Sequence, residues 1–220
     1  MTDAPTNALI LRLEACYTGV LHDVMRAMGL RDFTLPPELR PILPAQAMAG
    51  PVFTIDGMVD PAADGHHTLL EWTGLLSKAP AGSVWVCQPN DRTVAHMGEL
   101  SAETLKNKGV RGCLVDGFAR DANFLIEMGF QTWCRGFTPR DIVGHWLPRA
   151  TGVPIRIGDV TLHPGDYLVA DRDGAVCLPR SLAADIANRA EAAIATENKV
   201  RTAILGGMDP QEAYLAHGKF

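Results

Sequence analysis

The sequence predicts an α/β fold: one layered domain with a mixed sheet, an antiparallel β section and a long C-terminal helix. Strand and helix patterns alternate at short intervals between residues 50 and 128, which is typical of α/β units with some parallel pairing. Two pairs of apolar runs joined by turn residues follow over 153–178, and they predict antiparallel hairpins. An Ala-rich helical stretch then runs from Ser181 to about Leu205.

The first part of the chain is predicted to be helical. Apolar residues recur at spacings of three and four over 7–29, where Thr18 is a candidate cap of a second helix and Gly29 a candidate end. Four prolines exclude a regular helix from the next segment, 31–48, which is therefore expected to be a surface loop.

Two strands and a helix are expected next. Residues 50–56 and 83–88 are rich in β-branched and aromatic side chains and are bounded by turn-forming residues, so they predict strands. The helix between them is expected over 67–78, and the turn sequence at 80–82 closes it.

The centre of the chain has the most regular pattern. A helix is predicted over 101–108, a strand buried on both faces over 112–117, and a second helix over 121–128. Each helix is followed by a glycine, Gly109 or Gly129, as helix C-termini commonly are.

The last third changes to antiparallel patterns. A turn at 158–159 joins two short apolar runs, and a turn at 172–174 joins two more. The terminal helix is expected to have Ser181 as its N-cap and the glycines at 206–207 as its end.

Length and charge restrict the possible classes of protein. The 220 residues are enough for one well-buried domain, which we divide into a main α/β unit, 1–180, and a helical extension of the same unit, 181–220. The net charge of −5 disfavours nucleic acid and anionic membrane as partners, because both select a basic surface.

No targeting or spanning segment is expected. No apolar run approaches the roughly 20 residues of a membrane-spanning helix. The N-terminus lacks the basic start and apolar stretch of a signal peptide. The five cysteines include no C-x-x-C pair, which argues against a thiolate zinc site and against a disulfide framework. A cytoplasmic location is therefore expected.

Several common catalytic motifs are absent. No glycine-rich dinucleotide loop follows a strand, and the P-loop, H-E-x-x-H and G-x-S-x-G sequences are missing. The segments that remain of interest are 98–101 (GELS) and the dipeptide Arg120-Asp121, about twenty residues later.

These two segments occupy equivalent places around the central strand. Glu99 begins the helix before it and Asp121 begins the helix after it, and the first amide groups of a helix are free to bind a carboxylate or phosphate. A carboxylate that binds a hard cation and a guanidinium that binds a substrate carboxylate make a coherent set. The pattern predicts a site for a divalent ion and a small oxo acid.

A structural alternative stays open for each acid. Asp121 also fits an ordinary N-cap, and Glu99 a solvated residue of a first helical turn. The Arg-Asp dipeptide does not decide between them, because it is common in this chain. The four copies lie at 31–32, 120–121, 140–141 and 172–173.

A longer pattern surrounds the central strand. The run over 109–121 (GVRGCLVDGFARD) resembles the signature of the RraA-like family, which includes the 4-hydroxy-4-methyl-2-oxoglutarate aldolases. Other similar segments follow the family's order: Thr18-x-x-x-x-Asp23, 79–84 (APAGSV), Thr138-Pro139 and 164–174 (PGDYLVADRDG).

The resemblance implies a β/β/α fold of the swivelling type and a homotrimer or homohexamer with sites between subunits. It also implies a 2-oxo-acid substrate and a divalent cation, Mg²⁺ or Mn²⁺, as cofactor. By the same resemblance, Asp121 is the metal ligand and Arg120 holds the oxo acid and stabilises the enolate. The amides of Leu100 and Ser101, next to Gly98, would then hold the substrate carboxylate.

Three further residues carry implied roles. Glu99 stands where the family usually has aspartate, so its catalytic and substrate-binding role stays open. Glu197 resembles a glutamate that reaches the metal site of a neighbouring subunit, and the alternative is a surface pair with Arg201. His67 follows a turn that the family presents to the substrate, and the alternative is a solvated loop histidine.

The sequence thus predicts a metal-dependent pyruvate aldolase. It would cleave 4-hydroxy-2-oxo acids of the 4-hydroxy-4-methyl-2-oxoglutarate type and decarboxylate oxaloacetate, because both reactions leave a pyruvate enolate. No lysine lies beside the predicted site, which disfavours a Schiff base. Two alternatives stay open: a non-catalytic RraA-type regulator of RNase E, and another metal-dependent lyase or isomerase of sugar acids.

Overall fold

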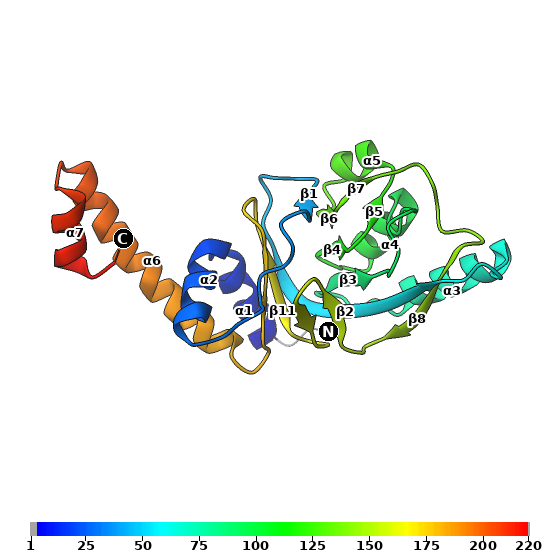
Figure 1. The fold of residues 1–220 in the computed structure, drawn as a ribbon, viewed down its shortest axis with the longest axis horizontal. Helices are drawn as coiled ribbons and strands as arrows, with labels where there is room; N and C mark the ends of the chain where they lie inside the picture. Colours follow the sequence, from blue (N-terminus) through cyan, green and yellow to red (C-terminus); the bar gives the residue numbers. More distant parts are fainter. Residues whose placement is uncertain (1–3, 220) are drawn as a thin grey trace.

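The fold is built around an eight-stranded mixed sheet in the order β1-β6-β4-β3-β2-β11-β12, with β8 paired to β2 (Figure 1). The computed structural model describes residues 4–219. The strands of this sheet are β1 (Arg40–Pro41), β2 (Met48–Val59), β3 (Val84–Gln88), β4 (Gly112–Val115), β6 (Thr132–Cys134), β8 (Trp146–Thr151), β11 (Tyr167–Ala170) and β12 (Ala175–Leu178). Two small pairs lie outside it: β5 (Phe118–Ala119) with β7 (Gly136–Phe137), and β9 (Ile155–Ile157) with β10 (Val160–Leu162).

Strands β2, β3, β4 and β6 run parallel and form the buried centre. Alternate residues of β3 face opposite layers. Trp85 packs with the helical layer of α3 (Gly65–Ser77), α4 (Glu99–Asn107) and α5 (Ala122–Glu127), whereas Val86 packs with the β9–β10 hairpin. This order of hairpin, sheet and helices is the predicted layered β/β/α arrangement, and the α/β fold class is confirmed.

The buried side chains on the helix side and on the hairpin side of the sheet form two hydrophobic cores, and a third core joins the two ends of the chain. Helices α1 (Ala4–Glu14) and α2 (Thr18–Ala27) pack with the first half of α6 (Ala183–Leu205) against β11 and β12. The second half of α6 and the short helix α7 (Pro210–His217) project away from the sheet as an arm (Figure 1). None of the helices in the described residues is long and apolar enough to cross a membrane.

Several predicted boundaries are wrong. Strand β2 is longer than 50–56 because a bulge at Asp56/Gly57 lets its second half pair with β8, which the sequence pattern did not indicate. The segment 31–48 contains the short strand β1, which pairs with β6. Helix α7 was also not predicted, although the Asp209 side chain caps its first turn at Gln211 and Glu212.

Ser181 is not the N-cap of the terminal helix. The amide of Leu182 donates to the carbonyl of Pro179 at 2.9 Å, so a tight turn continues through Ser181. Leu182 takes the N-cap position instead, and no side chain caps this helix end. Burial of Ile186 and Ala187 in the third core compensates for the missing cap, because packing stabilises a helix more than its cap does.

Gly57 at the bulge of β2 is a testable point of the fold. A Cβ atom on Gly57 would lie 1.8 Å from Cζ2 of the fully buried Trp146. We expect Gly57→Ala to lower the free energy of unfolding by about 3 kcal/mol, because neither backbone nor ring has room to move. The control is Gly74→Ala in α3, where a Cβ meets nothing within 4 Å. It is expected to stabilise by about 0.5–1 kcal/mol. Urea unfolding of the two variants measures both, and equal values would contradict the prediction.

Candidate active site

The starts of α4 and α5 converge on one carboxylate. Asp121 precedes α5 with φ of 58°, in the left-handed region, and its side chain makes no bond to its own helix. Instead, Asp121 Oδ2 accepts a hydrogen bond from the amide of Glu99 at 3.0 Å. Asp121 thus occupies the N-cap position of α5, as the structural alternative predicted, but its carboxylate caps the neighbouring helix α4 instead of its own.

The prediction of free amides at the helix starts holds only in part. The amide of Glu99 is bonded to Asp121. The amides of Leu100 and Ser101 belong to the same first turn of α4, where no intrahelical acceptor exists. These two amides are therefore the ones in this turn without a backbone partner, and their binding of an anion stays a prediction.

Parallel pairing of two short segments brings the helix starts together. The amide of His96 donates to the carbonyl of Phe118 at 2.9 Å. In the opposite direction, the amide of Arg120 donates to the carbonyl of Met97 at 2.8 Å. Gly98 completes the approach, since a Cβ there would lie 2.6 Å from Asp121 Oδ2. Gly98 has an extended backbone, so the requirement for glycine here is steric.

Arg120 lies between two carboxylates. Its Nε is 3.5 Å from Asp121 Oδ2, and its Nη1 is 3.3 Å from Asp141 Oδ2. Asp141 is fixed in turn, because its Oδ1 accepts from the amide of Val143 at 3.2 Å. Asp141 was not predicted as a site residue, because its Arg-Asp dipeptide is one of four in the chain and no local pattern distinguishes it.

A cleft of about 480 Å³ opens beside these residues. Its polar floor is formed by Gly98–Ser101 together with Arg120, Asp121 and Asp141. The rest of its lining is largely apolar and includes Leu69, Trp72, Leu76, Ile142 and Val143. A second hollow of about 310 Å³ shares Arg120 and Asp121 and is otherwise lined by Phe137–Pro139.

His96 lines the cleft as a neutral side chain. It is fully buried, and burial lowers the pKa of its imidazole to about 4, although Asp91 nearby works in the opposite direction. The His96 ring lies 5.0 Å from that of Trp146, centre to centre. At pH 7 the imidazole is uncharged, so Arg120 is the one cation among the cleft residues that the structure describes.

His67 lies outside the cleft of its own subunit. It belongs to the first turn of α3, where its amide donates to Asp64 Oδ1 at 2.8 Å. Its exposed ring is 3.9 Å from Glu71 Oε1, the next turn along the helix. Within one subunit the structure does not bring His67 to Arg120 and Asp121.

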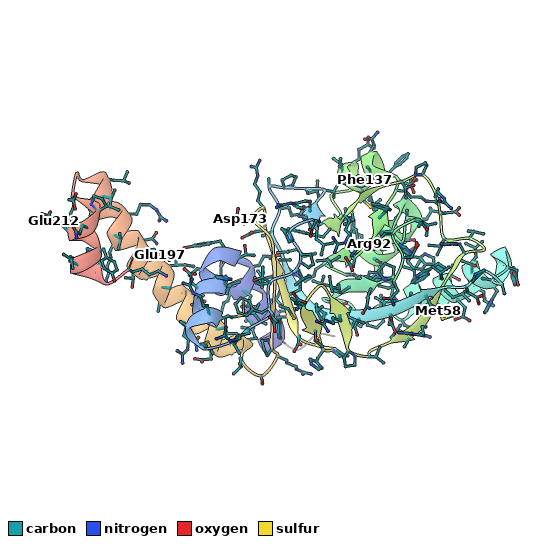
Figure 2. All side chains as sticks on the ribbon, viewed as in Figure 1. Met58, Arg92, Phe137, Asp173, Glu197 and Glu212 are labelled. Atoms are coloured by element: carbon teal, nitrogen blue, oxygen red, sulfur yellow. The ribbon has the colours of Figure 1, made fainter. Side chains whose placement is uncertain are left out.

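Glu197 lies on the arm, well away from α5 and on the other side of β11 in the view of Figures 1 and 2. It accepts a hydrogen bond from the hydroxyl of Tyr17 and pairs with Lys219 Nζ at 3.2 Å. Burial and this bond raise the pKa of Tyr17 to about 12. Arg201 bonds to Asn198, so the proposed surface pair of Glu197 with Arg201 is not formed. One subunit alone does not bring Glu197 to Asp121.

The donor set at the cleft suits a hard divalent cation. Glu99, Asp121 and Asp141 offer carboxylate oxygens, which Mg²⁺ and Mn²⁺ prefer. Within residues 4–219, no group of three or more His, Cys, Asp or Glu side chains is arranged to hold a metal ion by itself. Mg²⁺ commonly takes only one or two protein carboxylates and completes its shell with substrate and solvent oxygens. The carboxylates present are therefore of the chemical type that suits such a cation when substrate and solvent complete its shell.

Comparisons with known proteins agree with this architecture. Two sequence relatives are informative. DlpA of Legionella pneumophila is 25% identical over 93% of this chain, which spans only 33% of DlpA. A Halalkalibacterium halodurans protein provisionally named 4-hydroxy-4-methyl-2-oxoglutarate aldolase is 26% identical over 85% of each chain.

A solved structure is also similar. RraAS2 of Streptomyces coelicolor, described as an unusual member of the RNase ES inhibitor RraA protein family, matches with a TM-score of 0.79 at 28% identity. The match covers 91% of this chain and 99% of RraAS2. The RraA-like family model, described as Aldolase/RraA, matches residues 18–177, which include the whole sheet core and both helix starts of the cleft. By this match the chain belongs to the RraA-like family.

Proposed function

We propose that the protein is a divalent-metal-dependent aldolase that cleaves 4-hydroxy-2-oxo acids and releases pyruvate. The observation that supports this most is the meeting of Asp121, Arg120 and the free first-turn amides of α4 at one cleft. These groups supply a cation ligand, a guanidinium and two amide donors in one cleft that is large enough for a small molecule. Such a set matches the carboxylate and 2-oxo oxygens of pyruvate.

Each residue of the set has a separate task. The amides of Leu100 and Ser101 bind the substrate carboxylate, and the α4 dipole favours its charge. Arg120 donates to the 2-oxo oxygen and stabilises the negative charge that develops there when the C–C bond breaks. Asp121 holds the cation, and a divalent cation so held polarises the 2-oxo group. Glu99, which lines the same cleft, is assigned the removal of the proton of the 4-hydroxyl group.

The same enolate forms when oxaloacetate loses its C4 carboxylate, so decarboxylation is a second reaction open to this set. A Schiff-base route lacks a nucleophile. Lys106 Nζ donates to the carbonyl of Met128, and Lys108 Nζ donates to that of Ser77 at 3.1 Å. No lysine is among the described residues that line the cleft.

The working site is proposed to be completed by a second subunit in a homotrimer or homohexamer. Large apolar side chains surround the cleft in the isolated chain, and Leu100 is 75% exposed. Others are Leu69, Phe124, Phe137 and Val143 (Phe137 is labelled in Figure 2). Covering these side chains with another copy removes apolar area from water. In that assembly Glu197 would act in the site of the neighbour.

A non-catalytic RraA-type regulator is the second candidate, and the similarity to RraAS2 over most of both chains favours it. A regulator needs an outer docking surface but no cation at Asp121, so metal-dependent turnover separates the two. The five cysteines are free and buried, which supports the proposed cytoplasmic setting.

Chelation tests the metal requirement. In deuterated buffer the protein is expected to exchange the C3 protons of pyruvate, because the enolate forms in the same cleft without any acceptor. EDTA should abolish this exchange, and added Mg²⁺ or Mn²⁺ should restore it. Proton NMR of pyruvate follows the reaction. Exchange that survives chelation would contradict the metal-dependent mechanism, and no exchange with any metal would favour the regulator.

Two substitutions test the polar floor. Asp121→Asn keeps an acceptor for the Glu99 amide and tolerates the left-handed backbone, but removes the anionic cation ligand. We expect it to lower kcat about 100-fold. Arg120→Lys keeps the charge but loses the planar guanidinium, and we expect kcat/KM to fall about tenfold or more.

Pyruvate release is measured for both variants, with Asp159→Asn as a control. Asp159 is exposed in the β9–β10 turn, and it pairs there with Arg156 at 3.3 Å. Activity of Asp121→Asn equal to that of Asp159→Asn would contradict the assignment of Asp121.

The role of Glu197 is tested by complementation. Glu197→Gln keeps an acceptor for Tyr17 and removes the charge. It should lower kcat strongly on its own, as Asp121→Asn does. Co-expression of the two variants with different tags yields mixed oligomers, some of which hold one site with both native residues. Their activity should rise well above that of either parent. If mixed oligomers form and stay inactive, Glu197 does not act across subunits.

A further inference from the structure

Glu197 is held differently from the other two acidic side chains of α6. Asp185 and Glu191 form ion pairs with arginines at the surface, and their side chains are 49% and 46% exposed. The side chain of Glu197 is only 19% exposed, although it lies on the half of α6 that projects from the sheet (Figure 2). Arg201 stands four residues further along the helix, but it bonds to Asn198 instead. Glu197 is therefore not an ordinary solvated acid of a helix surface.

Two donors from distant parts of the chain hold the Glu197 carboxylate. The hydroxyl of Tyr17 donates to Oε2, and Nζ of Lys219 lies 3.2 Å from Oε1. Lys219 is shared, because the same Nζ is 3.6 Å from Asp23 Oδ2. Fixing a glutamate side chain costs up to about 2 kcal/mol of rotamer freedom. These contacts offset that cost before any ligand arrives.

Tyr17 itself is attached to a rigid part of the fold. It occupies the N-cap position of α2, a helix that packs in the third core. The next residue, Thr18, donates to Asp171 through both its amide and its hydroxyl, each at 2.7 Å. Asp171 directly follows β11. A chain of contacts thus runs from the sheet through Tyr17 to the Glu197 carboxylate. It also joins two of the segments that resemble the family, which the proposed function leaves unused.

We propose that Tyr17 is a positioning residue, whose hydroxyl fixes the Glu197 carboxylate in the orientation in which the arm presents it to the cleft of a neighbouring subunit. The inference rests on the proposed function and adds the residue that orients the contribution of the arm. A tyrosine hydroxyl is a neutral donor, so it orients the carboxylate without cancelling its charge. Tyr17 acts only through Glu197, and a carboxylate oriented in this way loses little freedom when it engages the neighbour.

Tyr17→Phe tests the hydroxyl, because it keeps the ring. We expect kcat for pyruvate release to fall about tenfold, while KM stays within about twofold, since the groups assigned to bind substrate lie elsewhere. Tyr214→Phe is the control, because it removes a hydroxyl from α7 of the same arm, where Tyr214 is 51% exposed. It should behave as the wild type. A kcat of Tyr17→Phe equal to that of the control, or higher, overturns the inference.

A double-mutant cycle separates positioning from general support of the fold. If Tyr17 acts through Glu197, Tyr17→Phe should have no further effect on kcat in a Glu197→Gln background. A structural role alone would lower kcat by the same factor in both backgrounds, and that result overturns the inference.

Binding of Mn²⁺ alone gives a second readout that needs no turnover. Calorimetric titration of the oligomer without any 2-oxo acid should show about threefold to tenfold weaker Mn²⁺ binding by Tyr17→Phe than by Tyr214→Phe. In the Glu197→Gln background the same change should leave the affinity unaltered. Equal weakening in both backgrounds assigns Tyr17 to the fold and overturns the inference.

Pyruvate exchange and Glu197→Gln distinguish a failure of this inference from a failure of the proposed function. If the wild type exchanges the C3 protons in a metal-dependent way, Glu197→Gln is impaired and Tyr17→Phe matches its control, the proposed function stands and the inference fails. If no exchange occurs with any metal, the proposed function fails and the inference fails with it. If exchange occurs but Glu197→Gln is fully active, the role of Glu197 fails, and that of Tyr17 fails too.

Discussion

The hydrogen bond from the Glu99 amide to the Asp121 carboxylate is the constraint on which the cleft depends. It ties the start of α4 to the start of α5, two helices that leave neighbouring parallel strands. Asp121 reaches that amide only from a left-handed backbone, which costs a non-glycine residue about 1 kcal/mol or more. A charge-assisted bond to a helix N-terminus offsets this cost. Gly98 provides the space, since any side chain there would meet the carboxylate.

One consequence is that the polar floor is preorganised. Arg120 is held by Asp121 and Asp141, and the segments that carry the two helix starts are joined by backbone hydrogen bonds. Groups fixed before a ligand arrives need little reorganisation, which favours stabilisation of a developing charge. The same arrangement brings three carboxylates and one guanidinium into the lining of the cleft. Most of the polar lining comes from the starts of α4 and α5, and much of the apolar lining comes from α3, whereas the loop at 141–143 contributes to both.

The arm is a separate feature of the single chain. In the isolated chain Glu197 is bonded to Tyr17 and Lys219, on a helix that leads away from the cleft. The arm exposes Leu205 and Leu215, and the surroundings of the cleft expose Leu100 and Phe137. The assembly proposed above would remove such apolar area from water.

Local pattern was sufficient for the fold class and for the starts of α4 and α5. Glycine caps, β-branched runs and short turns are signals that act over a few residues. The predicted central helices, the strands that became β3 and β4, and both hairpins were therefore confirmed. Boundaries set by pairing were not predicted: β2 extends through a bulge because β8 lies beside it, and Ser181 loses the N-cap position to a turn. The sequence placed Glu99 and Asp121 at two helix starts. Only the tertiary structure decided that Asp121 caps the other helix and that Asp141 shares Arg120, since both contacts join residues about twenty positions apart through parallel segments that carry no local signal.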